Sequence, residues 1–119
     1  IANSFGAYLL LLSMVNTELE LNNVILVSPV LGKAMSMERM SSSRPPRASG
    51  LLEAYKEGRL CQPKRLTVVY GSEDEGYCPE LTSCCLGAFG EAELILLGGE
   101  GHLIEPSILR GVLSELLEA

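Results

Sequence analysis

The sequence predicts a three-layer α/β fold, in which a parallel β-sheet has helices on both faces. Short β-branched runs recur along the chain, each closed by Gly or by Ser-Pro, as is typical of parallel strands that are covered on both faces. Helix-forming segments separate these runs, and such alternation indicates a parallel sheet with right-handed crossovers. With 119 residues, 47% of them hydrophobic, the chain is long enough to form one small domain with a core.

The elements are expected in the order helix, strand, helix, strand, helix, strand, helix. Residues 5–15 (FGAYLLLLSMV) are almost continuously apolar, which predicts a helix buried on most sides. Strands are predicted at residues 24–27 (VILV), 66–70 (LTVVY) and 94–97 (LILL). Further helices are predicted at about residues 50–58, 79–89 and 106–118, the last opening with Glu105 and Pro106. Residues 36–49, rich in Ser, Arg and Pro, predict a mobile loop.

Charge and hydropathy exclude two classes of partner. The net charge is −6 and the nine Lys and Arg residues are scattered, so we expect no binding to nucleic acid. The apolar run from Phe5 to Val15 is too short to span a bilayer and is broken by Gly6 and Ser13. No cationic segment precedes it, so neither a membrane span nor a secretory signal is expected.

The four cysteines predict free thiols. Cys84 and Cys85 are adjacent, and none of the four has Cys-x-x-Cys spacing, which disfavours a shared metal ion. We therefore expect small, buried or half-buried thiols and a reducing, cytoplasmic location. The four positions are Cys61, Cys78, Cys84 and Cys85.

Three polar residues follow predicted strands or precede the first helix, where the reactive groups of open α/β sheets collect. Ala2-Asn3-Ser4-Phe5-Gly6 precedes the apolar helix, Gly71-Ser72-Glu73-Asp74 follows the second predicted strand, and Gly98-Gly99-Glu100-Gly101-His102 follows the third. Small residues on either side of Ser4 permit a tight turn that projects its hydroxyl outward. His102 is the only histidine in the sequence.

These segments resemble the catalytic motifs of the α/β-hydrolases. The segment around Ser4 resembles the nucleophile elbow Gly-x-Ser-x-Gly, with Ala2 in place of the first Gly. Asp74, three residues after Gly71, matches the family's acid, and His102 lies where the family carries its general base. The order Ser, Asp, His is also the family's order. The resemblance covers the chain from the elbow to the final helix and implies the C-terminal half of such a hydrolase.

The resemblance implies a serine hydrolase with Ser4, Asp74 and His102 as its triad. His102 would remove the Ser4 proton, Asp74 would fix the imidazole, and the Phe5 backbone N–H would face the oxyanion. The implied substrate is a small acyl compound, by default an ester, with thioester, amide and acyl-transfer variants left open. No metal or organic cofactor is expected.

Each residue also has a plainer interpretation. Ser4 has the position of an ordinary helix N-cap, and Asp74 is one of three consecutive acids, so Glu73 and Glu75 remain rivals for its role. His102 alone is as compatible with a structural or exposed histidine. If the triad forms, Ser4 and Asp74 should lie about 2.6–3.2 Å from the two imidazole nitrogens.

Residues 33–60 occupy the place where many α/β-hydrolases carry a substrate-covering cap. They are interpreted as a reduced cap, with Met35, Met37 and Met40 offering adaptable apolar contacts. A surface loop with incidental methionines is the alternative.

The resemblance also implies missing parts. An intact α/β-hydrolase has a strand leading into the elbow, several earlier βα units and a second oxyanion donor, and we find none of these in the sequence. The sheet edge beside Val24–Val27 would then be exposed, which predicts association with a missing N-terminal half or with identical copies. Two alternatives remain: a catalytically silent assembly module, and a flavodoxin-like binding domain with Gly98–Gly101 as a phosphate loop.

Overall fold

The computed structural model describes residues 1–32 and 48–118, and within them a four-stranded, wholly parallel sheet forms the centre of the molecule. The strands follow one another across the sheet in chain order. They are β1 (Ala2–Asn3), β2 (Asn23–Val27), β3 (Arg65–Gly71) and β4 (Ala92–Leu97). The predicted α/β class with a parallel sheet is confirmed.

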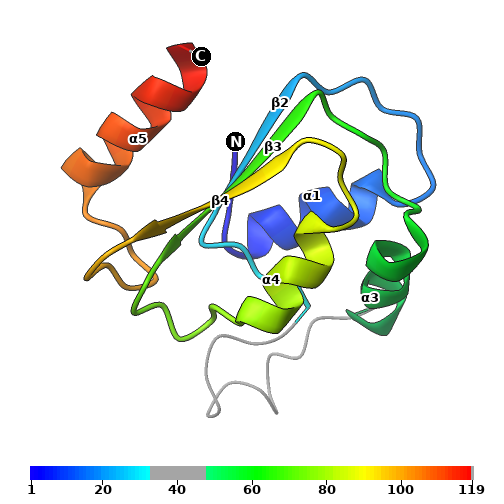
Figure 1. The fold of residues 1–119 in the computed structure, drawn as a ribbon, viewed down its shortest axis with the longest axis horizontal. Helices are drawn as coiled ribbons and strands as arrows, with labels where there is room; N and C mark the ends of the chain where they lie inside the picture. The colour runs from blue at the N-terminus through cyan, green and yellow to red at the C-terminus, as the bar shows by residue number, and fades with distance from the viewer. Residues whose placement is uncertain (33–47, 119) are drawn as a thin grey trace.

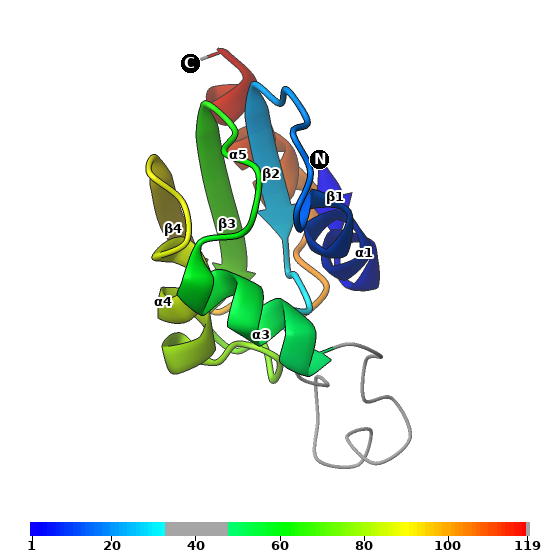
Figure 2. The same ribbon diagram turned by 90° about the vertical axis from the view of Figure 1, so that its right-hand side faces the viewer.

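Helices cover both faces of this sheet (Figures 1 and 2). Three of them, α1 (Phe5–Met14), α3 (Ala48–Glu57) and α4 (Pro79–Leu86), connect successive strands and share one face. Because the strands are added in one direction, crossovers of a single hand place every connecting helix on the same side. The last helix, α5 (Pro106–Glu118), follows β4 and packs on the opposite face.

Alternate residues of β2 explain why its sequence is apolar throughout. Val24 and Leu26 belong to the large core beneath α1, α3 and α4, whereas Ile25 and Val27 belong to the smaller core beneath α5. A strand covered on both faces needs an apolar side chain at every position, so period-two alternation disappears. The large core also holds Tyr8, Leu11, Met14, Leu51, Tyr55, Leu66, Val68, Tyr70, Leu81 and Cys85.

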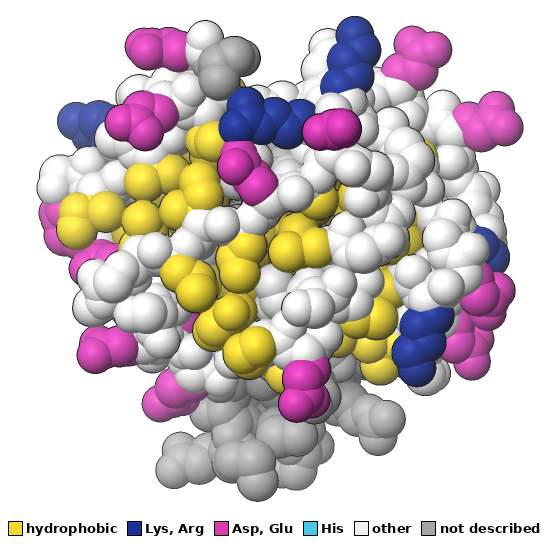
Figure 3. Space-filling model, viewed as in Figure 1, with side chains coloured by type: hydrophobic (Ala, Val, Ile, Leu, Met, Phe, Trp, Pro, Cys, Tyr) yellow, Lys and Arg dark blue, Asp and Glu magenta, His cyan; other side chains and the backbone are white. Residues whose placement is uncertain are grey.

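The smaller core is covered less completely. Within the described residues α5 is the one helix on this face, and Leu116 is its buried residue. Ile108 and Leu117 of α5 stay 42% and 62% exposed. Figure 3 shows hydrophobic side chains gathered on the side of the molecule where α5 lies.

The start of α5 is fixed by two carboxylates. Glu105 accepts hydrogen bonds from the Ser107 hydroxyl and from the amides of Ser107 (3.1 Å) and Ile108 (3.2 Å), which satisfies first-turn donors. These bonds, chiefly that from the Ser107 hydroxyl, lower the pKa of Glu105. The Glu105 amide in turn donates to Glu100 Oε1 at 2.7 Å. The glycine-rich segment before α5 is thereby closed into a loop.

Two expectations about elements were wrong. A short strand does lead into the predicted elbow, since Ala2 and Asn3 pair with Leu26 and Val27 of β2. A strand of two residues has no readable period, so sequence pattern did not reveal it. The helix predicted at 79–89 ends at Leu86, and Phe89 is apolar because it packs in the core rather than because it continues the helix.

The predicted cap falls largely outside the described residues. Residues 33–47, including Met35, Met37 and Met40, are not described. From residue 48 onward the segment forms α3, whose Leu51, Ala54 and Tyr55 are buried in the large core. This portion of the segment is therefore part of the folded layer over the sheet.

The cysteines are free thiols, as predicted. Cys61 and Cys85 are buried and Cys78 and Cys84 are half-buried. In the part of the chain that the structure describes, no helix has both the length and the apolar character needed to cross a membrane.

Candidate active site

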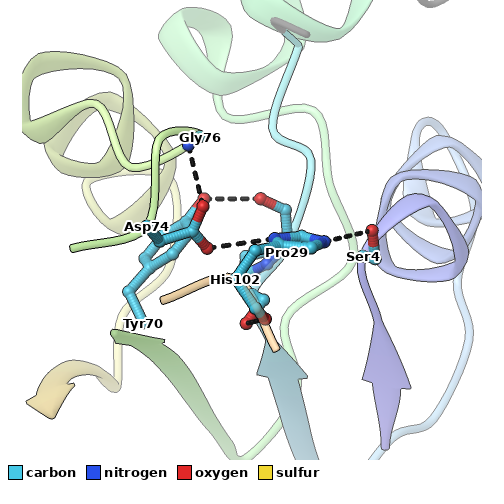
Figure 4. A network of polar contacts seen from close by, with 7 residues as sticks. Ser4, Pro29, Tyr70, Asp74, Gly76 and His102 are labelled. Atoms are coloured by element: carbon cyan, nitrogen blue, oxygen red, sulfur yellow. Dashed lines mark hydrogen bonds and ion pairs between the residues drawn. The ribbon is translucent and has the colours of Figure 1, made fainter. Parts of the chain in front are cut away.

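Ser4, Asp74 and His102 meet at the carboxyl end of the sheet (Figure 4). Ser4 follows β1, Asp74 lies in the loop after β3, and His102 lies in the loop after β4. Ser4 Oγ is 3.0 Å from His102 Nε2, and Asp74 Oδ2 is 3.1 Å from His102 Nδ1. Parallel strands end at one edge, which brings together side chains 98 and 28 residues apart in sequence.

The backbone at Ser4 adopts a conformation that side chains rarely tolerate. Its φ of 53° and ψ of −122° lie outside the allowed regions for an L-residue. The Ser4 amide donates to Val27 O at 3.0 Å, and its carbonyl accepts from Ala7 N and Val30 N at 3.1 Å each. Such strain costs about 1–3 kcal/mol and persists where the surroundings impose it, commonly at functional sites. The turn is the sharp strand-to-helix turn that the sequence predicts.

Ser4 does not act as a helix cap. It occupies the N-cap position of α1, yet its side chain makes no capping hydrogen bond. The hydroxyl instead contacts His102. Because the polar side chain gives up the contact that usually makes serine favourable there, the N-cap interpretation does not account for this residue.

Asp74 is a fully buried carboxylate with defined partners. Its side chain is 0% exposed, and Oδ1 accepts a hydrogen bond from Gly76 N at 2.8 Å while Oδ2 faces His102. An ionised carboxylate only accepts hydrogen bonds, so His102 Nδ1 must carry the proton in this contact. In the neutral imidazole, Nε2 is then left to accept a hydrogen bond from the Ser4 hydroxyl.

The rival acids lie elsewhere. Glu73 and Glu75 are exposed, and neither side chain contacts His102. Glu73 contributes through its backbone, because its amide donates to the Glu100 carbonyl at 2.9 Å. Of the three consecutive acids, Asp74 is the one that the fold turns inward.

The loops after β3 and β4 are packed backbone to backbone. A Cβ atom at Gly71 would lie 2.1 Å from the Glu100 carbonyl oxygen and 2.6 Å from that of Gly101, so only glycine permits this approach. The Ser72 hydroxyl also accepts a hydrogen bond from Gly99 N at 3.0 Å. These contacts hold the acid and the histidine in register.

Two further residues contact the site and were not predicted from the sequence. Ser28, directly after β2, donates its hydroxyl to the His102 carbonyl at 2.9 Å. Tyr70, at the end of β3, donates to the Pro29 carbonyl at 2.6 Å (Figure 4). Burial, and next the Asp74 carboxylate, raise the pKa of Tyr70 well above its ordinary range. The available signal is the Ser-Pro sequence after β2, which as a local pattern indicates the end of a strand and carries no sign of a contact with His102.

The amide of Phe5 is the predicted oxyanion donor. It is the first amide of α1, and no described residue accepts a hydrogen bond from it. A helix N-terminus also presents positive potential to an anion. The Phe5 ring is 44% exposed and stacks on Tyr8, with ring centroids 5.4 Å apart.

Other polar groupings lie apart from this site. A shallow hollow at the opposite end of the sheet is lined by Lys64, Arg65, Glu91, Ala92 and Glu93. Arg65 and Glu93 already neutralise each other in an ion pair of 2.5 Å. Among residues 1–32 and 48–118, no group of three or more His, Cys, Asp or Glu side chains is arranged to hold a metal ion.

In comparisons with known proteins, neither a protein-family model nor a curated protein matches this sequence. We therefore infer function from the geometry of Ser4, Asp74 and His102.

Proposed function

We propose that this chain is a serine hydrolase acting on small acyl substrates, ester-type by default, and that it corresponds to the C-terminal half of an α/β-hydrolase. The observation that carries the proposal is the continuous hydrogen-bonded chain from Ser4 through His102 to the buried Asp74. Nucleophile, base and orienting acid in this geometry are the arrangement that activates a serine hydroxyl.

The strain at Ser4 supports the same proposal. A nucleophile needs its hydroxyl projected at the end of the sheet, and the sharp turn with φ 53° and ψ −122° at Ser4 suits that need. The three side chains come from three separate strand ends, and Asp74 is buried with its own amide donor. Each feature favours catalysis over an incidental polar cluster.

The proposed reaction is acyl transfer to Ser4 followed by hydrolysis. His102 Nε2 takes the hydroxyl proton as Ser4 Oγ attacks the substrate carbonyl, and the same nitrogen then delivers that proton to the leaving group. Asp74 holds the proton of Nδ1 in place and stabilises the imidazolium. Water, deprotonated by His102, releases the acid and regenerates Ser4.

The Phe5 amide would donate to the oxyanion of the tetrahedral intermediate. Loss of one oxyanion donor costs on the order of a hundredfold or more in rate. α/β-Hydrolases draw a second donor from a loop after an early strand, and we propose that another segment or chain supplies it here. The chain alone would then react slowly with substrates that depend on both donors.

A fluorophosphonate probe tests the proposal directly, because it phosphonylates an activated serine without a matching substrate. We expect labelling of Ser4, detected by peptide mass spectrometry, and its loss in Ser4→Ala and His102→Ala. Ser13→Ala is the matched control, since Ser13 is an exposed serine of the same helix with its hydroxyl on Leu10 O. A folded chain that remains unlabelled at Ser4 would contradict the proposal and favour the silent assembly module.

We further propose that the chain associates through the sheet edge beside β1, with an identical copy or with a segment that completes the sheet. β1 covers only Leu26 and Val27 of β2, which corrects the expectation that all of Val24–Val27 is uncovered. Beside this edge Ile1, Phe5 and Leu9 are 66%, 44% and 54% exposed. The free thiols support the cytoplasm as the proposed location.

A further inference from the structure

Ser28 lies at the carboxyl end of β2, between the strands that carry Ser4 and Asp74. Its side chain is buried with the residue 1% exposed, and its hydroxyl donates to the backbone carbonyl of His102 at 2.9 Å. This hydrogen bond joins residues 74 apart in sequence. The hydrogen bond therefore holds the backbone of His102 itself rather than that of a neighbouring residue.

The loop that carries His102 is held against the loop after β3 as far as Gly101, but beyond Gly101 it has few hydrogen bonds. Upstream, Glu100 accepts from Glu73 N, and downstream Glu105 N donates to Glu100 Oε1. Between Glu100 and Glu105, no backbone group other than the His102 carbonyl is hydrogen-bonded to a described residue. Ile104 is buried in the smaller core and anchors the loop against the sheet. Because an apolar contact is not directional, it does not fix the orientation of the His102 peptide unit.

The anchor itself is rigid. The Ser28 amide donates to Val69 O at 2.7 Å, Pro29 O accepts from the Tyr70 hydroxyl at 2.6 Å, and Val30 N donates to Ser4 O at 3.1 Å. The segment 28–30 is thus braced against the strand that carries Asp74 and against Ser4 itself. A displacement of this segment would move the histidine relative to both of its partners.

The backbone angle makes serine an unexpected residue here. Ser28 has a φ of 47°, a region in which Gly, Asn and Asp are the residues usually found. A serine held there needs a compensating contact, and the hydrogen bond to His102 is the side-chain contact that Ser28 makes. The hydroxyl is engaged and buried, so it is not available as a second nucleophile.

We propose that Ser28 is a positioning residue, whose hydroxyl holds the His102 carbonyl and so keeps the imidazole aligned between Ser4 and Asp74. This inference rests on the proposed function, since alignment matters chiefly if His102 acts as a base. A misplacement on the order of 1 Å in a catalytic group can cost about a hundredfold in rate.

Nuclear magnetic resonance of the untagged chain tests the positioning without relying on activity. Because His102 is the only histidine, a long-range proton–nitrogen spectrum shows a single imidazole. We expect the protein as it stands to show one tautomer, with the proton on Nδ1. Ser28→Ala should give an averaged mixture of tautomers, and fluorophosphonate labelling of Ser4 should slow by about 5- to 50-fold at a temperature where the chain is fully folded.

Two variants serve as controls. Ser13→Ala removes another hydroxyl that donates to a backbone carbonyl, at Leu10, and should leave the imidazole spectrum unchanged. Ser28→Gly removes the hydroxyl and also relieves the positive φ, so it should fold at least as well as Ser28→Ala and show the same mixed tautomers.

Each outcome separates the two proposals. An unchanged imidazole spectrum in both Ser28 variants would overturn the positioning role. Unfolding of both variants would overturn it as well, because Ser28 would then hold the fold rather than the histidine. A Ser28-dependent spectrum in a chain whose Ser4 is never labelled would leave the positioning role intact and contradict the serine hydrolase.

Discussion

Asp74 is the residue whose replacement best distinguishes a triad from a cluster of surface acids. Asp74→Asn keeps the shape of the side chain but presents the wrong partner to Nδ1, so the imidazole adopts the wrong tautomer. We expect the rate of fluorophosphonate labelling at Ser4 to fall by about 10²–10⁴-fold. Glu73→Gln and Glu75→Gln, which remove exposed charges, should change that rate by no more than about twofold. A larger effect of either control would reassign the acid.

The strained backbone at Ser4 should lower the stability of the fold. Ser4→Ala removes the hydroxyl and keeps the strained backbone, whereas Ser4→Gly removes both the hydroxyl and the strain. We expect Ser4→Gly to be more stable than Ser4→Ala by about 1 kcal/mol in urea denaturation, with both unlabelled by the probe. Equal stability of the two variants would show that the turn is relaxed in solution.

The candidate triad was accessible from the sequence because each member lies in a short local pattern. Ser4 has small neighbours before a helix, Asp74 follows a strand and a glycine, and His102 lies among glycines. Ser28 was not accessible, because its role depends on a carbonyl 74 residues away and on no local pattern. The choice between Asp74 and its acidic neighbours also required the fold, which alone decides which side chain turns inward.

The contact between Gly71 and the loop after β4 makes Gly71 sensitive to substitution. Gly71→Ala would place Cβ 2.1 Å from Glu100 O, and backbone on both sides would have to move. We expect a loss of about 2–4 kcal/mol in the free energy of unfolding, measured by urea denaturation. Gly98→Ala, in the loop after β4 with no atom within 4 Å of the added Cβ, should cost less than about 1 kcal/mol. Similar costs for the two would mean that the loops separate readily.

The buried thiol of Cys85 and the buried phenols of Tyr55 and Tyr70 predict that the fold loses stability in alkali. Burial raises the pKa of Cys85 from its ordinary value near 9 to about 12, and burial also raises those of Tyr55 and Tyr70. Between pH 9 and 12 the folded chain therefore keeps protons that the unfolded chain releases, and stability falls as pH rises. Each such group contributes up to about 1.4 kcal/mol per pH unit.

Urea denaturation at several pH values between 8 and 11 checks this expectation. Cys85→Val should flatten the fall between pH 9 and 10, where Cys85 is the first of these groups to contribute. Leu81→Val, a buried and non-ionisable change on the same helix, should lower stability equally at every pH. An identical slope in both variants would contradict the assignment to Cys85.

Helices and strands were predictable from the sequence where burial alone determines which residues occur in them. The strands β2, β3 and β4 were found because burial on both faces demands apolar side chains, and their observed ends lie within two residues of the predicted ones. The two residues of β1 are a strand only because β2 lies beside them. The predicted helix at 79–89 extends beyond the observed end of α4 for a similar reason. Phe89 is apolar because it is buried in the core, so it carries no information about the length of the helix.

The exposed apolar side chains of α1 bear on whether the chain associates with other chains. α1 is apolar on nearly every side, yet Phe5 and Leu9 are exposed beside the two-residue edge strand. A helix of this kind is normally buried all round. We expect sedimentation velocity to show concentration-dependent association, which Leu9→Glu weakens. Leu117→Glu, a charge on an equally exposed leucine of α5, should leave it unchanged, and a strictly monomeric chain at all concentrations would contradict the proposed edge.

Ser4 and His102 are 98 residues apart in sequence, so their contact closes a long loop of the chain. Contacts between distant residues are slow to form, because the entropy of the intervening chain must be lost first. The proposed reactivity of Ser4 depends on His102, which follows β4, and would therefore report the docking of β4 rather than the recovery of secondary structure alone.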